Sequence, residues 1–327
     1  MTRNGLILSL MTGVILLCGC QTPTPSAASQ NSPLRQTLRP QAVEILKASL
    51  RDENPMIRIH AIEAAAETQH KDAMTEIMRM MGDEAAAIRF AAVTAAGDMA
   101  CYGCEQEVRR RLTDADENVR LAAAYTLVKF NYRDFHSSLR QAANAHDDST
   151  VRANAVLLLG KVGNREDLDL LYKVMRDDHA DDKVRFQAIE SIARLKDTRL
   201  YRSKLWSLLI SKYADDRVMG IRAMGALGTQ DAKSAIMTML GDDVLEVRLA
   251  AAEQLGRLGD RYGREEVAAY LAQNPDFNQP DMATLLAIMA IGRIGTPELT
   301  AHLPAALNSR SAMIRLTAAQ SVLLLTR

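Results

Sequence analysis

Residues 147–160 read DDSTVRANAVLLLG, and this stretch decides the fold because its pattern recurs along nearly the whole chain. An acidic pair precedes Val151 and Arg152. Ala155 follows four residues after the valine, and Leu159 and Gly160 follow eight and nine residues after it. The stretch is therefore one unit of a repeat.

The position of Val151 recurs nine times, at spacings of 28 to 36 residues, as Ile57, Ile88, Val119, Val151, Val184, Met219, Val247, Ala283 and Ile314. An alanine follows four residues after every one of them: Ala61, Ala92, Ala123, Ala155, Ala188, Ala223, Ala251, Ala287 and Ala318. The residue directly after the valine position is arginine in seven units, with Gly220 and Thr284 as the exceptions. Nine alanines in nine units are too regular for chance.

Each feature of the unit has a physical reason. Apolar residues at the valine position and three, four and seven or eight residues beyond it form one stripe of a helix. The alanine predicts a close crossing with a neighbouring helix. Acidic or amide residues before the stripe suit helix N-caps: Asn54, Asp116, Asp148, Asp216 and Asp243. Glycines after it suit helix C-termini: Gly97, Gly160, Gly228, Gly256 and Gly292.

A second amphipathic segment precedes each of these helices. Examples are REDLDLLYKVM at residues 165–175, AKSAIMTML at 232–240 and EEVAAYLA at 265–272. Paired helices at a fixed period build a solenoid, in which each unit buries its apolar face only by stacking on its neighbours. The sequence thus predicts an all-α fold, an α-solenoid of about nine helix pairs over residues 41–327.

The unit, best seen at residues 147–160 and 215–228, resembles the short HEAT repeat that is also found in phycobilisome lyases. The period near 32 is shorter than that of most HEAT arrays. The resemblance implies that aspartate and arginine form a structural ladder between neighbouring turns. The residues concerned are Asp148, Arg152, Arg58, Arg89, Arg120, Arg185, Arg248 and Arg315. It implies a fold and says little about function.

The first residues have the features of an export signal. Arg3 is followed by an apolar run at residues 6–17, which is too short to span a membrane as a helix. The run ends in Leu17-Cys18-Gly19-Cys20, which resembles a bacterial lipobox. The resemblance implies removal of residues 1–19 and lipidation of Cys20; the alternative is an ordinary secretory signal with an incidental cysteine. Several acyl chains on one residue give stable anchoring.

Residues 20–40 contain four prolines with Ser, Thr and Gln, and we expect a flexible tether between the lipid and the solenoid. Gln21 follows the cysteine, a pattern that resembles lipoproteins released to the outer membrane of a diderm bacterium. The expected location is therefore the cell envelope, with the protein on the periplasmic face of the outer membrane in a diderm.

Composition and motifs argue against several activities. Basic and acidic residues number 40 each, whereas a general nucleic-acid binder carries a surplus of Lys and Arg. Deoxyhypusine hydroxylases, an enzymatic branch with similar repeats, hold iron through His-Glu pairs, but none of the six histidines here is followed by Glu. No phosphate loop, zinc helix or serine elbow occurs. We expect neither an enzyme nor any cofactor or metal site.

Cys101 and Cys104 form a CxxC pair in the turn after the second unit's inner helix. In an exported compartment a small structural disulfide is the favoured interpretation. The alternatives are a redox-active pair, which usually needs a helix N-terminus in a βαβ setting, and free thiols or a metal site.

If the solenoid binds a partner, we expect its concave wall to do so, because the second helix of each unit lines that wall. The candidate surface comprises Tyr125, Lys129, Lys161, Glu190, Arg194, Glu253, Arg257 and Arg293. The positions ten residues after the valine are acidic in the first two units, at Glu67 and Asp98, and basic in nearly all the others. The simpler explanation is that cations at helix C-termini favour the helix dipole.

The chain ends in SVLLLTR at residues 321–327, without a polar capping helix. Either the last helix buries its leucines against its predecessor, or an apolar end accepts a partner or a second copy. We expect a non-catalytic scaffold or adaptor for unidentified envelope proteins, attached to the membrane by lipid. The alternatives are an accessory subunit of an envelope enzyme or redox system that uses the CxxC pair, and a structural protein of the envelope.

Overall fold

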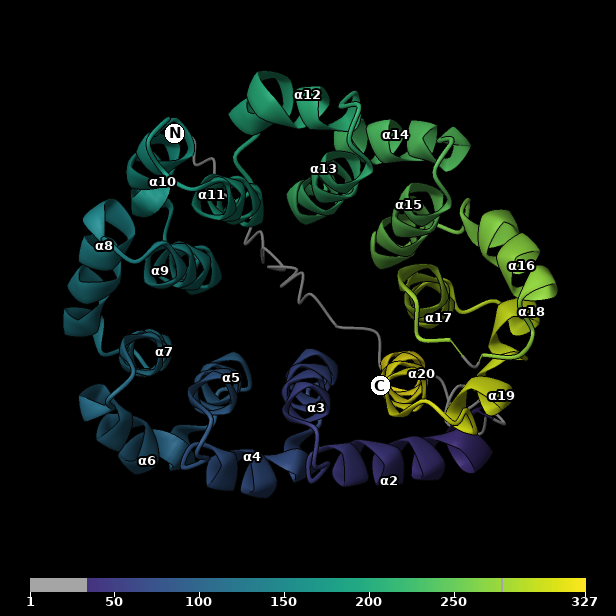
Figure 1. Ribbon diagram of the computed structural model, residues 1–327, viewed down its shortest axis with the longest axis horizontal. Helices are drawn as coiled ribbons and strands as arrows, with labels where there is room; N and C mark the ends of the chain where they lie inside the picture. Colours follow the sequence, from purple (N-terminus) through teal and green to yellow (C-terminus); the bar gives the residue numbers. More distant parts are fainter. Residues whose placement is uncertain (1–33, 278) are drawn as a thin grey trace, which may run out of the picture.

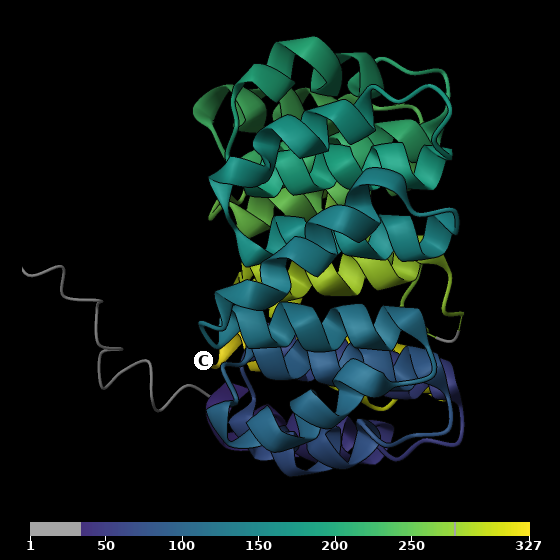
Figure 2. The ribbon, with the colours of Figure 1, turned by 90° about the vertical axis from the view of Figure 1, so that its left-hand side faces the viewer.

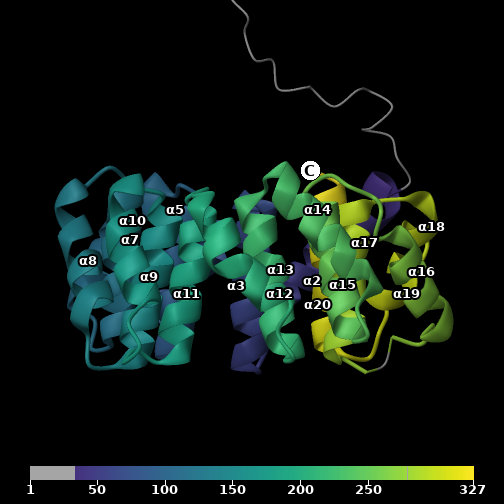
Figure 3. The same ribbon diagram turned by 90° about the horizontal axis from the view of Figure 1, so that it is seen from above.

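The computed structural model describes residues 34–277 and 279–327, and within them it contains helices, turns and loops but no strand. The predicted signal peptide and Cys20 lie outside the described residues. The helices form two concentric layers of a closed ring (Figure 1). Figures 2 and 3 show the ring from two sides, and it is about as deep as one inner helix is long. The predicted all-α solenoid of about nine helix pairs is confirmed for the described residues.

The inner layer consists of the helices that carry the repeated motif. They are α3 (Pro55–Thr68), α5 (Ala86–Asp98), α7 (Glu117–Lys129), α9 (Ser149–Val162), α11 (Asp182–Arg194), α13 (Ala214–Leu227), α15 (Leu245–Arg257), α17 (Met282–Ile294) and α20 (Ala312–Leu325). The nine alanines that recur in the sequence are all buried in this layer. Their small side chains allow consecutive inner helices to pack directly on one another, which is the close crossing that the alanines predicted.

The outer layer consists of the shorter helices that precede each inner helix. They are α2 (Arg39–Ser49), α4 (Met74–Met80), α6 (Glu105–Arg110), α8 (His136–Ala145), α10 (Leu168–Met175), α12 (Trp206–Leu209), α14 (Gln230–Thr238), α16 (Arg264–Gln273), and the pair α18 (Pro297–Thr300) and α19 (Leu303–Leu307). The three amphipathic segments quoted from the sequence coincide with α10, α14 and α16 and the short turns beside them.

The ring closes because the first and last units pack on each other. Helix α20 contacts both α2 and α3 of the first unit as well as its predecessor α17. Arg39 Nη1 donates hydrogen bonds of 2.8 Å to the carbonyl oxygen and to Oγ1 of Thr326. Gln41 Nε2 donates to Asn308 Oδ1 at 3.1 Å. The apolar C-terminal face is thus covered by the chain's own first unit. The last helix therefore packs on its predecessor, as one alternative predicted, and also on the first unit, which neither alternative included.

Helical structure begins earlier than the boundary that the prolines suggested. A single turn of π-helix at Leu34–Leu38 leads into α2, so residues 34–40 are part of the ring instead of the tether. Leu34 and Leu38 pack against the core, and Arg39 makes the closing contact with Thr326. Pro40 is compatible with a helix here because it stands at the start of α2, where a backbone NH has no partner inside the helix.

The glycines near the ends of the inner helices have a different role from the predicted one. At Gly97, Gly160, Gly256 and Gly292 the helix has not ended, and an added Cβ would lie 2.5–2.9 Å from an atom of the next inner helix. At two of these crossings a serine of the next helix donates to a carbonyl four residues before the glycine. These bonds are Ser191 Oγ to Val156 O and Ser321 Oγ to Ile288 O. Only Gly228, with φ of +68°, ends a helix as predicted.

The N-cap predictions are correct for three of the five residues. Asn54, Asp116 and Asp148 accept hydrogen bonds from backbone NH groups of the first helical turn. Asp216 lies inside α13, and Asp243 precedes the start of α15 by two residues, so neither caps a helix. Asp181, Asp281 and Ser311 cap the three helices whose caps the pattern missed.

The sixth unit begins three residues earlier than the sequence pattern placed it. Arg217 donates to the carbonyl of Ser211, six residues before it, as the repeat arginines of five other units do. Gly220 then takes the place of the repeated alanine, and an added Cβ there would lie 2.9 Å from Leu208 Cβ. The choice of Met219 and Ala223 was therefore wrong. It also produced the uneven spacings of 35 and 28 around this unit.

Candidate functional site

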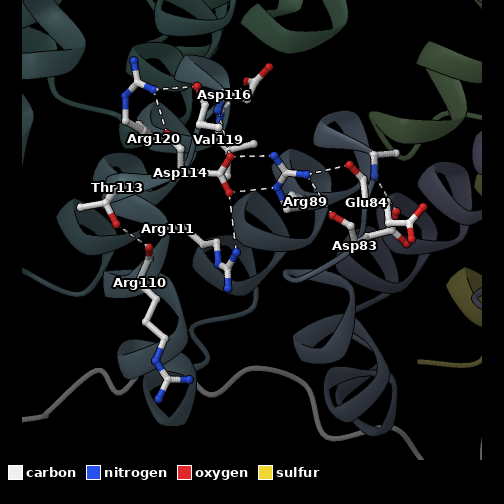
Figure 4. A network of polar contacts seen from close by, with 12 residues as sticks. Asp83, Glu84, Arg89, Arg110, Arg111, Thr113, Asp114, Asp116, Val119 and Arg120 are labelled. Carbon is white, nitrogen blue, oxygen red and sulfur yellow. Dashed lines mark hydrogen bonds and ion pairs between the residues drawn. The ribbon is translucent and has the colours of Figure 1, made fainter.

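The repeat arginines are used by the frame of the ring. Arg89 donates from Nη1 to the carbonyls of Asp83 and Glu84, both at 2.9 Å, which closes the turn before its own helix. Its Nε and Nη2 bind both oxygens of Asp114 in the next unit, at 2.9 and 2.7 Å (Figure 4). The Arg89 and Asp114 side chains are only 13% and 4% exposed. Four of the five guanidinium donors are thus used within the protein, and a paired, buried fork of this kind serves structure.

The same spacing of 25 residues links other units. Arg152 binds Asp177 at 2.8 Å, Arg217 binds Asp242 at 2.8 Å, and Arg58 lies 3.6 Å from Asp83. The remaining repeat arginines bind carboxylates or carbonyls nearby: Arg120, Arg185, Arg248 and Arg315. Asp148 caps α9 and takes no part in the ladder, so that part of the prediction was wrong. Arg217 is the ladder arginine that the displaced pattern missed.

Three ladder carboxylates, Asp114, Asp177 and Asp242, have a pKa below the ordinary value. Burial alone would raise the pKa of Asp114. The hydrogen bonds from Arg89 and from the Asp116 backbone NH outweigh this effect and lower the pKa. The hydrogen bond from Arg152 likewise lowers the pKa of Asp177. These groups are therefore charged in the folded state at neutral pH.

The inner surface of the ring carries the candidate binding residues, but several of them are bound to one another. Tyr125 is fully buried, and its hydroxyl donates to Asp98 Oδ1 at 2.5 Å. Burial, with the neighbouring Asp98 charge, raises the pKa of this phenol, which stays protonated. Lys161 reaches the other oxygen of Asp98 at 2.6 Å. Tyr125 is therefore part of the packing and does not belong to a binding surface.

Ring closure brings the acidic start of the inner surface against its basic end. Arg293 on α17 forms an ion pair with Glu67 on α3, and its Nε lies 3.4 Å from Glu253. Gln320 on α20 donates to the second oxygen of Glu67 at 2.6 Å. The change of sign along this row thus places opposite charges on the two sides of the closing seam. The helix dipole alone did not explain it.

Of the remaining candidates, Arg194 is bound to Glu190 at 2.6 Å. Lys129 and Arg257 are exposed and have no side-chain partner within the described part of the chain. The structure adds Arg222, which is also exposed and unpartnered among the described residues and which was not among the residues predicted from the sequence. In the corrected register it occupies the same position in α13 as Glu190 in α11 and Glu253 in α15.

A charged cavity of about 570 Å³ lies at the end of the ring where the inner helices terminate. Its wall includes most of the candidate surface together with the seam: Lys161, Glu190, Arg194, Glu253, Arg257, Arg293, Glu67, Asp98 and the newly found Arg222. Lys129 and Tyr125 do not line it. The structure thus brings six of the eight predicted surface residues into one cavity.

A second, more apolar cavity of about 810 Å³ continues from the first toward the starts of the same helices. The two cavities share Glu190, Arg222 and Leu286. Across the ring a smaller apolar hollow of about 420 Å³ lies beside Ile59, Phe90 and Leu157, with Asp98 and Lys161 at its edge. The inner surface therefore offers both apolar and charged contacts.

Cys101 and Cys104 form a disulfide in the turn between α5 and α6, where the sequence placed the pair. The Cys104 side chain is buried, with 1% exposed, and lies in the core. Tyr102 between them packs against Phe130, with the two rings tilted by 43° and their centroids 5.1 Å apart. These contacts favour a structural role.

Residues 34–277 and 279–327 contain no group of three or more His, Cys, Asp or Glu side chains placed to hold a metal ion. Within those same residues, none of the helices is both long and apolar enough to cross a membrane.

The family model for HEAT repeats matches residues 42–108, 105–193 and 203–277. The chain belongs to the HEAT-repeat family. A search of curated proteins found no match.

Several solved structures resemble this HEAT-repeat chain in fold. Human deoxyhypusine hydroxylase is 18% identical with a TM-score of 0.37, and the match covers 79% of this chain and 96% of the hydroxylase. The complex of CpcE and CpcF of phycocyanin lyase from Nostoc is 17% identical with a TM-score of 0.43, and the match covers 77% of this chain and 93% of that chain. Importin beta is 15% identical with a TM-score of 0.36, and the match covers 86% of this chain and 47% of importin beta. At these identities the likeness concerns the fold alone.

Proposed function

We propose that this HEAT-repeat ring is a non-catalytic scaffold that binds other proteins through its inner surface. The proposal rests on the different roles of two groups of residues in the ring. The repeated arginines and alanines serve the frame, whereas most of the residues that line the two connected cavities on the inside differ between units. Repeat proteins with a closed frame and a variable wall are suited to recognising polypeptides.

We further propose that a lipid on Cys20 holds the ring at the bacterial cell envelope. The apolar run, the Leu17-to-Cys20 tetrapeptide and the Pro-rich segment after it support this location. If the anchor is present, replacing Cys20→Ser will move the protein from the membrane fraction to the soluble fraction. Recovery of the variant in the membrane fraction at the level of the unchanged protein would contradict the anchor.

Site-specific photocrosslinking in cells tests the binding surface. A photoreactive amino acid at Met289, which lines the charged cavity, is expected to capture a discrete protein partner. The matched control places the same amino acid at Tyr262, which is 66% exposed and lines neither of the two connected inner cavities. Capture from Tyr262 but not from Met289 would place binding elsewhere and refute the proposal.

A further inference from the structure

The two connected cavities form one groove along the inner wall between α11 and α17. Lys183 and Ala214 lie at its apolar end, near the starts of their helices, and Arg194 and Arg257 lie at its charged end, where their helices finish. The inner helices are seen nearly end-on in Figure 1, so the groove follows the axis of the ring. A helix of 13 residues is about 20 Å long, at roughly 1.5 Å per residue.

The apolar half of the groove is lined by apolar side chains that are only partly buried in the core. Phe186, Val218 and Met219 are half-buried, and Met282 is 57% exposed at the start of α17. Thioether side chains adapt their shape to different apolar ligands. This half therefore suits bulky apolar side chains.

The charged half contains two arginines that have no partner in the described residues, Arg222 and Arg257. Glu190 and Glu253, two acidic residues that line the same cavity, already have partners, because Glu190 binds Arg194 and Glu253 binds Arg293. The helix dipole explains a cation at a helix end such as Arg257. It does not explain Arg222, the ninth of fourteen residues in α13, which stands where the two cavities meet.

We propose that this groove binds an extended polypeptide segment that presents a carboxylate to Arg222 and Arg257 and bulky apolar side chains to the half beside Met219 and Met282. Guanidinium groups bind carboxylates through two parallel hydrogen bonds, which gives both strength and orientation. About six extended residues, at roughly 3.3 Å each, match the length of the groove. The inference rests on the proposed function and names its partner class.

An array of random hexapeptides, each made with a free C-terminal carboxylate and as a C-terminal amide, tests the inference on the full-length protein. The bound peptides are expected to combine two or more bulky apolar residues with a carboxylate. Binding that survives amidation assigns the carboxylate to an Asp or Glu side chain, and binding lost on amidation assigns it to the peptide terminus.

Fluorescence polarisation of the best peptides then measures the arginines. Arg222→Ala is expected to raise Kd at least tenfold, Arg257→Ala to act in the same direction, and Arg222→Lys to restore part of the affinity. The matched control is Arg202→Ala with Arg261→Ala, which removes two exposed arginines that line neither cavity. It is expected to leave Kd unchanged.

An array without binders, or equal affinity for the Arg222→Ala with Arg257→Ala double variant and the control, would overturn the inference. Peptides that lack a carboxylate but lose binding on Met282→Glu would overturn the carboxylate clamp and leave the proposed inner binding surface intact. Peptides that bind equally to all these variants would count against the inner surface as well.

Discussion

The ion pair of Arg89 and Asp114 gives the sharpest prediction about stability. Asp114→Ala removes both hydrogen bonds to Arg89, at 2.9 and 2.7 Å, and the bond of 3.0 Å from the Asp116 backbone NH. It leaves the Arg89 guanidinium, 13% exposed, without its carboxylate. Breaking one partner of a buried pair costs about 3–5 kcal/mol of the free energy of unfolding. We expect a loss in that range, read from urea unfolding followed by circular dichroism.

Asp243→Ala is the matched control. Asp243 also bonds to a ladder arginine, Arg217, at 3.0 Å, but its side chain is 88% exposed. An exposed pair of this kind contributes about 0.2–1 kcal/mol. Equal losses in the two variants would refute the reasoning that burial, and not the mere presence of an ion pair, gives the ladder its strength.

Three further predictions concern packing, pH and the closing seam. Gly160→Ala places a Cβ 2.5 Å from Ser191 Oγ, so we expect a loss of about 1–3 kcal/mol, whereas Gly103→Ala meets nothing within 4 Å and should be near neutral in the same urea assay. Because the folded pKa of Asp114 lies below its unfolded value of about 3.9, the unfolded chain binds more protons in acid. The contribution of Asp114 to the free energy of unfolding is therefore complete above about pH 5 and is lost as pH falls through the folded pKa. The unfolding midpoint of Asp114→Ala should depend less on pH in this range than that of the unchanged protein. Glu67→Gln removes the charge that faces Arg293 across the seam, and hydrogen exchange should become faster in α2 and α20 than in α9, on the far side of the ring; equal changes in all three would contradict a seam.

The sequence predicted the units because the residues that make them act locally. Val151 and Ala155 belong to one helix, and their spacing shows the buried stripe directly. The displacement in the sixth unit has an equally local cause. Gly220 replaces the repeated alanine, and Met219 with Ala223 imitates the motif three residues later. The hydrogen bond from Arg217 to Ser211 reveals the true register, and only the structure shows it.

Ring closure could not be predicted, because it depends on the small rotation between successive units summed over the chain. The charges of Glu67 and Arg293 were visible in the sequence, but their meeting across 226 residues was not. The same holds for the glycines. Gly160 looked like a helix end, and its role depends on Ser191 of the next unit lying against it. Arg222 was missed because the displaced register placed Gly225, six residues after Met219, at the position that Glu190 and Glu253 occupy in their units.

Crosslinking across the seam tests the closed ring most directly. Gln41 and Asn308 are hydrogen-bonded at 3.1 Å between the first and last units. Cysteines at both positions should be joined within one chain by a bismaleimide crosslinker with a six-carbon spacer, identified as a linked peptide by mass spectrometry. Gln41→Cys combined with Tyr213→Cys, at the start of α13 on the opposite side of the ring, should not be joined. Unlinked cysteines at positions 41 and 308, or links only between chains, would contradict the closed ring.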